Sequence, residues 1–150
     1  MTILLLFLTL SIGFSFLCSI LEAVILSITP SFIRKQRDKN PQLYKDLNSF
    51  KEDIDKPLSA ILTLNTIAHT VGAIGVGAQA AVVFGSTAIN IFSFQIPAES
   101  IVATVMTLAI LILSEIIPKT LGANYWKSLT PISIKGIKIL MKILMPLVWM

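Results

Sequence analysis

One short segment combines residue types that could bind a cation. It reads Ser114-Glu115-Ile116-Ile117-Pro118-Lys119 and follows the apolar stretch 98–113, whose single charge, Glu99, lies near its start. A carboxylate inside an apolar helix is costly in hydrocarbon and therefore indicates a functional site with a partner. Pro118 has no backbone N–H, so a carbonyl one turn earlier, near Ser114, loses its donor. A carboxylate beside a free carbonyl offers the oxygen ligands that hard cations bind.

The composition predicts an all-α membrane protein whose surroundings are a lipid bilayer. Of its 150 residues, 55% are hydrophobic and 13% are charged, against about 25% charged in soluble domains. The single cysteine, Cys18, excludes a disulfide within one chain. The basic residues flank apolar segments and form no separate basic domain, so we expect no nucleic-acid partner.

Three apolar segments are long enough to cross a bilayer as helices. They cover residues 1–28, 57–84 and 97–122, and each exceeds the roughly 20 residues that a spanning helix needs. The first has no basic start and no small-residue cleavage site, which favours a retained helix over a signal peptide. The polar segment 29–56 and the segment 85–97 are expected to be loops.

The basic residues predict the orientation. Residues 31–56 contain seven Lys or Arg, residues 57–118 contain none, and lysines return from Lys119 onward. Because cytoplasmic loops carry the excess of Lys and Arg, the basic loop and the C-terminal segment are predicted to be cytoplasmic. The N-terminus then lies outside, in a multi-pass protein of the plasma or inner membrane.

The segment 128–150 is predicted to be an amphipathic juxtamembrane helix. Its lysines share one helix face: Lys135, Lys138 and Lys142. In a spanning helix they would sit too deep to reach the headgroups, whereas a helix lying in the interface accommodates them. We expect the helix to turn back near Pro146; a fourth spanning helix is the alternative.

Polar residues on the three spanning segments fall at one depth. Glu22, Asn65 and Glu115 lie six, eight and seven residues from the predicted cytoplasmic ends of their helices, or roughly 9–12 Å. Each also has a simpler explanation. Serines such as Ser11 and Ser15 commonly bond a carbonyl of their own or a neighbouring helix. Glu22 could reach toward the headgroups, and His69 could be a packing residue.

These same residues carry a family resemblance. The segment from Ser114 to Leu121 resembles the E-x-x-P-K-T signature of the DUF21 membrane domain in the CNNM/CorC family of magnesium transporters. Two earlier segments agree with it in order: Ser19-Ile20-Leu21-Glu22-Ala23 and Leu64-Asn65-Thr66. The resemblance covers essentially the whole chain.

The resemblance implies a sodium-coupled exporter of Mg²⁺ that works as a homodimer of three-helix units. A cytoplasmic CBS-pair module of the full-length chain is expected to follow this membrane domain. By motif position, a dehydrated Mg²⁺ in an inward-facing cavity is held by Ser19, Asn65 and Glu115. Possible supporting residues are Glu22, His69, Ser114, Pro118 and Lys119.

Two positions depart from the family pattern. Leu64 stands where a glycine is common, and His69 stands where a second asparagine is common. Neutral imidazole suits hard cations such as Na⁺ less well than an amide oxygen does. The second possible function is a non-transporting membrane anchor or regulator with a structural or sensing cation site. An enzyme is not expected, since no nucleophile elbow or third orienting residue accompanies His69.

Overall fold

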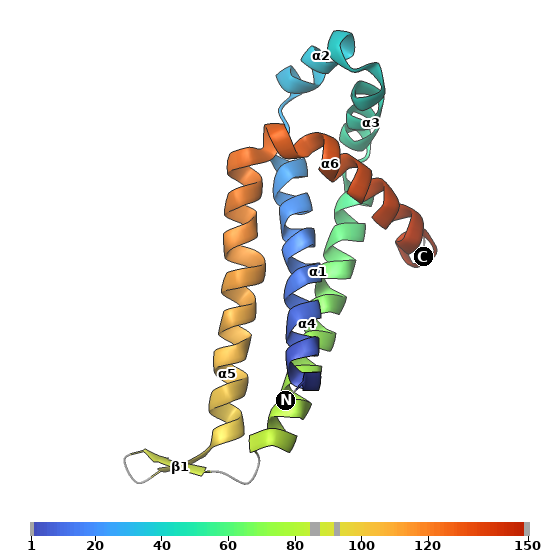
Figure 1. The fold of residues 1–150 in the computed structure, drawn as a ribbon. Coiled ribbons are helices and arrows are strands. Elements are labelled where there is room, and N and C mark those ends of the chain that lie inside the picture. The colour runs from blue at the N-terminus through green and yellow to red at the C-terminus, as the bar shows by residue number, and fades with distance from the viewer. Residues whose placement is uncertain (1, 85–87, 92–93, 149–150) are drawn as a thin grey trace.

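The computed structural model describes residues 2–84, 88–91 and 94–148, and it consists mainly of helices. The long helices α1 (Thr2–Ser27), α4 (Asp55–Phe84) and α5 (Ala98–Leu111) lie alongside one another with alternating directions (Figure 1). The short helices α2 (Pro30–Lys39) and α3 (Pro41–Glu52) lie beyond one end of this bundle. A π-helical turn, η1 (Ile112–Ile116), joins α5 to α6 (Ile117–Val148).

Three helical stretches are long and apolar enough to cross a membrane: 2–27, 55–83 and 98–144. Their outward faces carry large exposed side chains, among them Phe14, Val71, Ile74 and Leu108. In water such a surface would be unfavourable, but in a bilayer it contacts lipid tails. The fold is therefore an all-α architecture of a membrane protein.

The connection from α1 to α4 is a pair of capped helices. Thr29 caps α2 by accepting a hydrogen bond from the Phe32 N–H, and Asn40 caps α3 by accepting from the Leu43 N–H. Pro30 and Pro41 occupy the first positions of these helices, where a missing N–H is harmless. The basic segment 29–56, expected from the sequence as a loop, is thus helical over most of its length.

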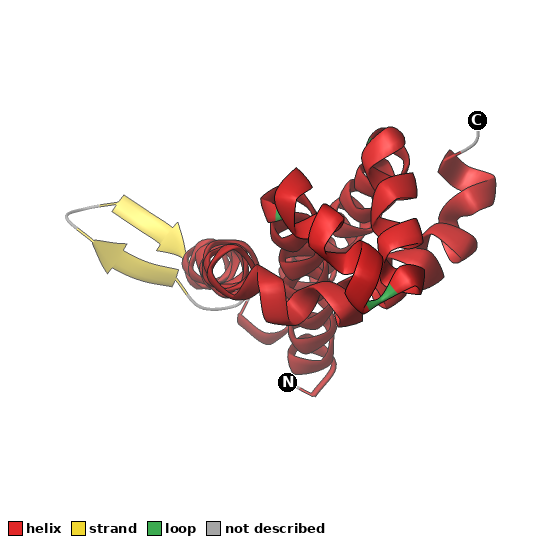
Figure 2. Cartoon of the chain, turned by 90° about the horizontal axis from the view of Figure 1, so that it is seen from above, coloured by secondary structure: helices red, strands yellow, loops and turns green. Residues whose placement is uncertain are grey.

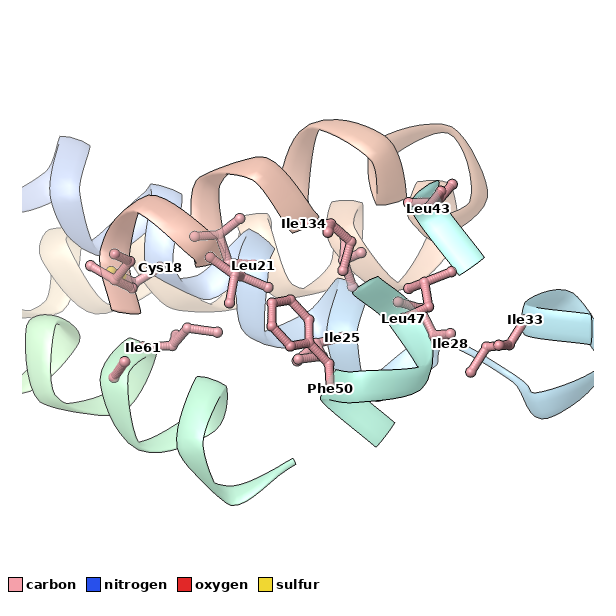
Figure 3. Close-up of a cluster of buried hydrophobic side chains, with 14 residues drawn as sticks. Cys18, Leu21, Ile25, Ile28, Ile33, Leu43, Leu47, Phe50, Ile61 and Ile134 are labelled. Atoms are coloured by element: carbon pink, nitrogen blue, oxygen red, sulfur yellow. The ribbon is translucent and has the colours of Figure 1, made fainter. Parts of the chain in front are cut away.

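The apolar core is concentrated where α2 and α3 meet the bundle, which we call the basic end (Figure 3). Buried residues from five helices and the turn after α1 pack there, including Ile25 of α1, Ile28 of the turn, Ile33 of α2, Leu47 and Phe50 of α3, Ile61 of α4, and Ile134 and Ile137 of α6. An ion pair between Lys138 Nζ and Asp46 Oδ1, 2.5 Å apart, also joins α6 to α3. The basic end is therefore held by both apolar packing and charge.

Helix α6 first completes the third spanning stretch and then changes direction. Tyr125 interrupts its helical geometry with φ −106° and ψ 17°, and the following part runs across the end of the bundle (Figure 1). From Ala98 to Tyr125 the chain rises roughly 40 Å, enough to cross a bilayer. The spanning helix and the tail are continuous through this kink, and α6 extends past Pro146 to Val148.

The part of α6 after the kink has three faces. One is buried against the protein and includes Thr130, Ile134 and Ile137. The predicted lysine face is exposed, and the third face exposes large apolar side chains: Ile132, Ile139 and Ile143. At 100° per residue the lysines lie between the two apolar faces, an arrangement suited to a helix lying at a membrane surface.

A small antiparallel hairpin lies at the opposite end of the bundle from the basic end. Strand β1 (Ala88–Ile91) pairs with β2 (Phe94–Pro97) in the register Ala88↔Pro97. Seen from above, the hairpin points sideways, away from the helices (Figure 2). The sequence predicted only a loop here, because four-residue strands leave a weak period-2 signal.

Candidate cation site

Four polar side chains from three elements form one connected network inside the bundle. Ser15 Oγ of α1 lies 2.7 Å from Asn65 Oδ1 and 2.8 Å from His69 Nε2, both on α4. His69 Nε2 in turn lies 3.0 Å from Glu115 Oε1 of η1. Two residues predicted as ligands, Asn65 and Glu115, are thus brought together through Ser15 and His69.

The direction of these hydrogen bonds follows from the single proton of Ser15. The hydroxyl donates it to Asn65 Oδ1, so Ser15 Oγ accepts from His69 Nε2–H. That same N–H faces the Glu115 carboxylate. In this structure His69 therefore supplies to Glu115 the favourable contact that a cation would otherwise supply.

Glu115 sits on a turn whose backbone is opened by Pro118. The Ile117 N–H donates to Ile112 O, five residues back, in place of the α-helical acceptor Leu113 O. The next donor for Leu113 O would be residue 118, but proline has none. Pro118 also removes the α-helical donor of Ser114 O. Backbone carbonyls beside Glu115 are therefore available as oxygen ligands.

Ser19 lies one turn from Ser15 along α1, toward the basic end, and it is fully buried. In the described part of the chain, its Oγ has no hydrogen-bond partner. A buried hydroxyl without a partner costs free energy unless a ligand satisfies it. Ser19 is thus not part of the Ser15 network, but its Oγ is a candidate ligand atom about 6 Å further along the helix.

The other predicted supporting residues have identifiable roles. Glu22 pairs with Lys119, with Oε2 and Nζ 3.2 Å apart, which joins α1 to α6. Among the described atoms this Glu22 oxygen has no aligned hydrogen bond, so the contact is electrostatic. Ser114 Oγ donates to Ile110 O at 2.6 Å within its own helix, and Pro118 is buried.

Glycines bring the three helices close around the network. A Cβ built on Gly72 of α4 would overlap Ser11 Oγ of α1, and one on Gly122 of α6 would lie 2.8 Å from Ala23 Cβ of α1. Ser11 Oγ also donates to Ala68 O at 3.0 Å. Gly77 differs, with nothing within 4 Å of its built Cβ. Gly72 and Gly122 therefore set the spacing of the helices that carry the site.

From the sequence alone, Ser15 was interpreted as an ordinary helix-packing serine. The structure instead places it at the centre of the network. It does bond a neighbouring helix, as expected, but it bonds two predicted site residues at once. A signal for this is the spacing of Asn65 and His69, four residues apart on one face of α4. One side chain on the facing helix can contact both.

Chemically, the arrangement offers hydroxyl, amide, carboxylate and carbonyl oxygens at the centre of a membrane bundle. Hard cations bind such oxygens, and the imidazole of His69 is the exception among the groups present. The side chains of His69 and Glu115 are 27% and 32% exposed, so they are not sealed within this single chain. The fold therefore defines a membrane protein with several candidate spanning helices and a polar centre between them.

Comparison with known proteins agrees with this class. Residues 5–150 match the family described as CNNM, the cyclin M transmembrane N-terminal domain, and the chain belongs to this family. The family is linked to Mg²⁺ transport and comprises transporters rather than enzymes. The chain is also 29% identical over 134 residues to the UPF0053 protein sll1254 of Synechocystis sp. (strain ATCC 27184 / PCC 6803 / Kazusa). That match covers 89% of this chain but only 36% of the relative.

Proposed function

We propose that this chain is the membrane domain of a Mg²⁺ exporter that binds a dehydrated ion between α1, α4 and η1. The observation that carries the proposal is the position of Glu115, on a proline-opened turn and 3.0 Å from His69 of α4, which in turn contacts Ser15 of α1. Mg²⁺ requires close, near-octahedral oxygen ligands and releases its water reluctantly. A buried set of preformed oxygens would compensate for that dehydration.

In this proposal Ser19, Asn65 and Glu115 bind the ion, and carbonyls freed by Pro118 complete the shell. The orphaned Oγ of Ser19 supports its assignment. Asn65 has its Oδ1 engaged by Ser15, and Glu115 is engaged by His69. Binding of Mg²⁺ would therefore require His69 to move away from Glu115, because Nε2–H and a cation compete for the same carboxylate.

The direction and partners of transport are further parts of the proposal. The Lys/Arg distribution supports a cytoplasmic position for the basic end. In the proposal the ion therefore enters from that side and leaves toward the N-terminal side. Na⁺ is the proposed coupling ion. Three helices alone leave His69 and Glu115 partly exposed, which supports a homodimer that shields the site, together with a cytoplasmic CBS-pair module of the full-length chain.

Flux into liposomes tests the function. The reconstituted protein should carry Mg²⁺ down its gradient to an enclosed Mg²⁺-sensitive dye, and an opposing Na⁺ gradient should accelerate the flux. Glu115→Gln should abolish it, whereas Glu99→Gln, at the other end of the third spanning stretch, should not. Mg²⁺ binding without any flux would contradict the proposal and favour a membrane anchor with a sensing site.

A further inference from the structure

A cleft at the basic end, remote from the Ser15 network, has no role in the function proposed above. It lies between α2 and the part of α6 just after the kink and has a volume of about 500 Å³. It is lined by Thr29, Ser31, Phe32, Lys35, Gln36, Lys39, Trp126 and Lys127. Every lining side chain is cationic, neutral-polar or aromatic, so the cleft presents positive charge and hydrogen-bond donors with no carboxylate.

The three lysines of the cleft belong to the lysines that have no carboxylate partner among the described residues. Lys56, Lys119 and Lys138 each lie within ion-pair distance of a carboxylate. No described carboxylate lies within that distance of Lys35, Lys39 or Lys127. Like charges gathered around one cavity repel one another unless an anion lies between them, so this cleft favours an anionic occupant.

An aromatic pair forms the wall that joins the two sides of the cleft. Phe32 of α2 and Trp126 of α6 meet edge to face with ring centroids 5.0 Å apart. Lys127 Nζ lies 5.5 Å from the Trp126 ring centroid, a cation–π distance. These contacts hold α2 against α6, so the lysines are presented from a fixed frame rather than from independent loops.

The position of the cleft along the bundle matches a membrane surface. Trp126 directly follows the kink at Tyr125, where the third spanning stretch ends, and Thr29 follows the end of α1 at Ser27. Apolar side chains are exposed just inside this level: Leu26 at 57% and Leu121 at 39%. Tryptophan is enriched at this depth in membrane proteins. An occupant there could place a charged group in the cleft and apolar chains along the helices.

We propose that this cleft binds a phosphate group through Lys35, Lys39 and Lys127, with Ser31 as an additional donor. The depth of the cleft indicates the phosphodiester headgroup of an anionic glycerophospholipid as its source; a free phosphate is the other source of the same chemistry. Basic pockets beside spanning helices on the cytoplasmic side bind such headgroups. Occupancy would stabilise the contact of α2 with α6 and hence the orientation of the tail.

Trp126 provides a local probe of the cleft. The chain has two tryptophans, Trp126 and Trp149, and Trp149→Phe leaves Trp126 as the single fluorophore of this type. This variant is placed in phosphatidylcholine bilayers. Lipids with brominated acyl chains, either phosphatidylglycerol or phosphatidylcholine, are then added at equal mole fractions. Brominated phosphatidylglycerol should quench Trp126 with about tenfold higher relative affinity, as expected for several lysines near one headgroup.

Two triple variants with the same change in charge separate this cleft from general surface attraction. Lys35→Gln, Lys39→Gln and Lys127→Gln together should remove the preference for phosphatidylglycerol. Lys45→Gln, Lys51→Gln and Lys142→Gln together, on exposed positions outside the cleft, should retain most of it. If the first triple variant does not fold, its three single substitutions should each lower the relative affinity about two- to fivefold.

A second experiment identifies the source of the phosphate. The protein is placed in bilayers of phosphatidylcholine alone, and inorganic phosphate replaces chloride in the surrounding buffer. A change in Trp126 emission that needs the three cleft lysines, without a lipid preference, would support the site and identify free phosphate as its occupant. The proposal is overturned if neither probe acts on Trp126, or if both triple variants reduce the response equally. None of these readouts depends on Mg²⁺.

Discussion

At the scale of single residues, His69 connects the two predicted ligands Glu115 and Asn65, through its contacts with Glu115 and Ser15. Its Nε2 lies 3.0 Å from Glu115 Oε1 and 2.8 Å from Ser15 Oγ, so one N–H bridges the carboxylate and the serine that holds Asn65. This contact satisfies Glu115 when no cation is present. In the proposed function a cation would have to displace the imidazole, which would lower the apparent affinity of the site.

Replacing this residue should strengthen binding. His69→Asn removes the competing N–H donor next to Glu115 and can supply an amide oxygen in its place. A hydrogen bond to a charged group contributes about 1.5–3 kcal/mol, so the Kd for Mg²⁺ should fall about tenfold. Calorimetric titration of the detergent-purified protein measures it. An unchanged or weaker affinity would show that His69 supports the bound state rather than competing with it.

Ser15 and Ser19 give a matched pair because both are buried on the same face of α1. Ser15→Ala leaves Asn65 and His69 without their shared partner and should lower stability by about 1–3 kcal/mol in the absence of Mg²⁺. Ser19→Ala removes an oxygen that makes no described hydrogen bond, so it should leave that stability nearly unchanged.

Adding Mg²⁺ to the same two variants distinguishes a serine that binds the ion from one that only supports the structure. If Ser19 is a ligand, Ser19→Ala should reduce the Mg²⁺-dependent rise in Tm, which follows the ratio of concentration to Kd. Thermal melting with and without Mg²⁺ measures both effects. A normal Mg²⁺ response in Ser19→Ala together with a lost response in Ser15→Ala would transfer the ligand role to Ser15.

At the scale of elements, the spacing between α1 and α4 depends on Gly72. A methyl group there would overlap Ser11, so Gly72→Ala should push the two helices apart and cost about 1–3 kcal/mol. Gly77→Ala is the control on the same helix, because a Cβ there meets open space. It should be neutral or stabilising by up to about 1 kcal/mol through helix propensity. Equal loss of stability in both variants would refute the close-contact explanation.

The elements also show what sequence reasoning could and could not reach. Long apolar runs predicted helices at 1–28, 57–84 and 97–122, because a bilayer requires such lengths. The helices within 30–52 were missed, since their stability comes from burying Leu47 and Phe50 against α1 and α6, contacts that no local pattern reveals. The proline near Glu115 predicted an opened backbone, but the π-turn itself depends on packing.

Side-chain partners were harder to predict than depth. Matching distances from the helix ends predicted Glu22, Asn65 and Glu115 at one level. Asn65 and Glu115 do join one network, whereas Glu22 pairs with Lys119 instead. Helix ends read from a sequence are uncertain by about one or two residues, and a shift of one turn along the axis exchanges Ser15 for Ser19. The axial position is fixed by close contacts such as Gly72 with Ser11, which involve residues more than fifty positions apart.

At the scale of the whole molecule, the orientation in the membrane can be tested with two serines. Ser49 of α3 and Ser100 of α5 are both exposed and lie toward opposite ends of the bundle. In a Cys18→Ala background, Ser100→Cys should react with an impermeant thiol reagent on intact cells, while Ser49→Cys should react only after the membrane is opened. The reverse pattern would invert the orientation and the proposed direction of export.

The central claim is that residues from separate helices bind one cation, and a double-mutant cycle on Mg²⁺ affinity tests it most directly. Calorimetry would compare Glu115→Gln, Asn65→Ala and the double variant, with Glu99→Gln as a charge-matched control that should bind normally. Groups that share one ligand couple by about 0.5–3 kcal/mol, whereas sites more than roughly 7–10 Å apart are additive. We predict that Asn65→Ala costs little once Glu115 is neutralised. Full additivity of the two substitutions would contradict a single shared site.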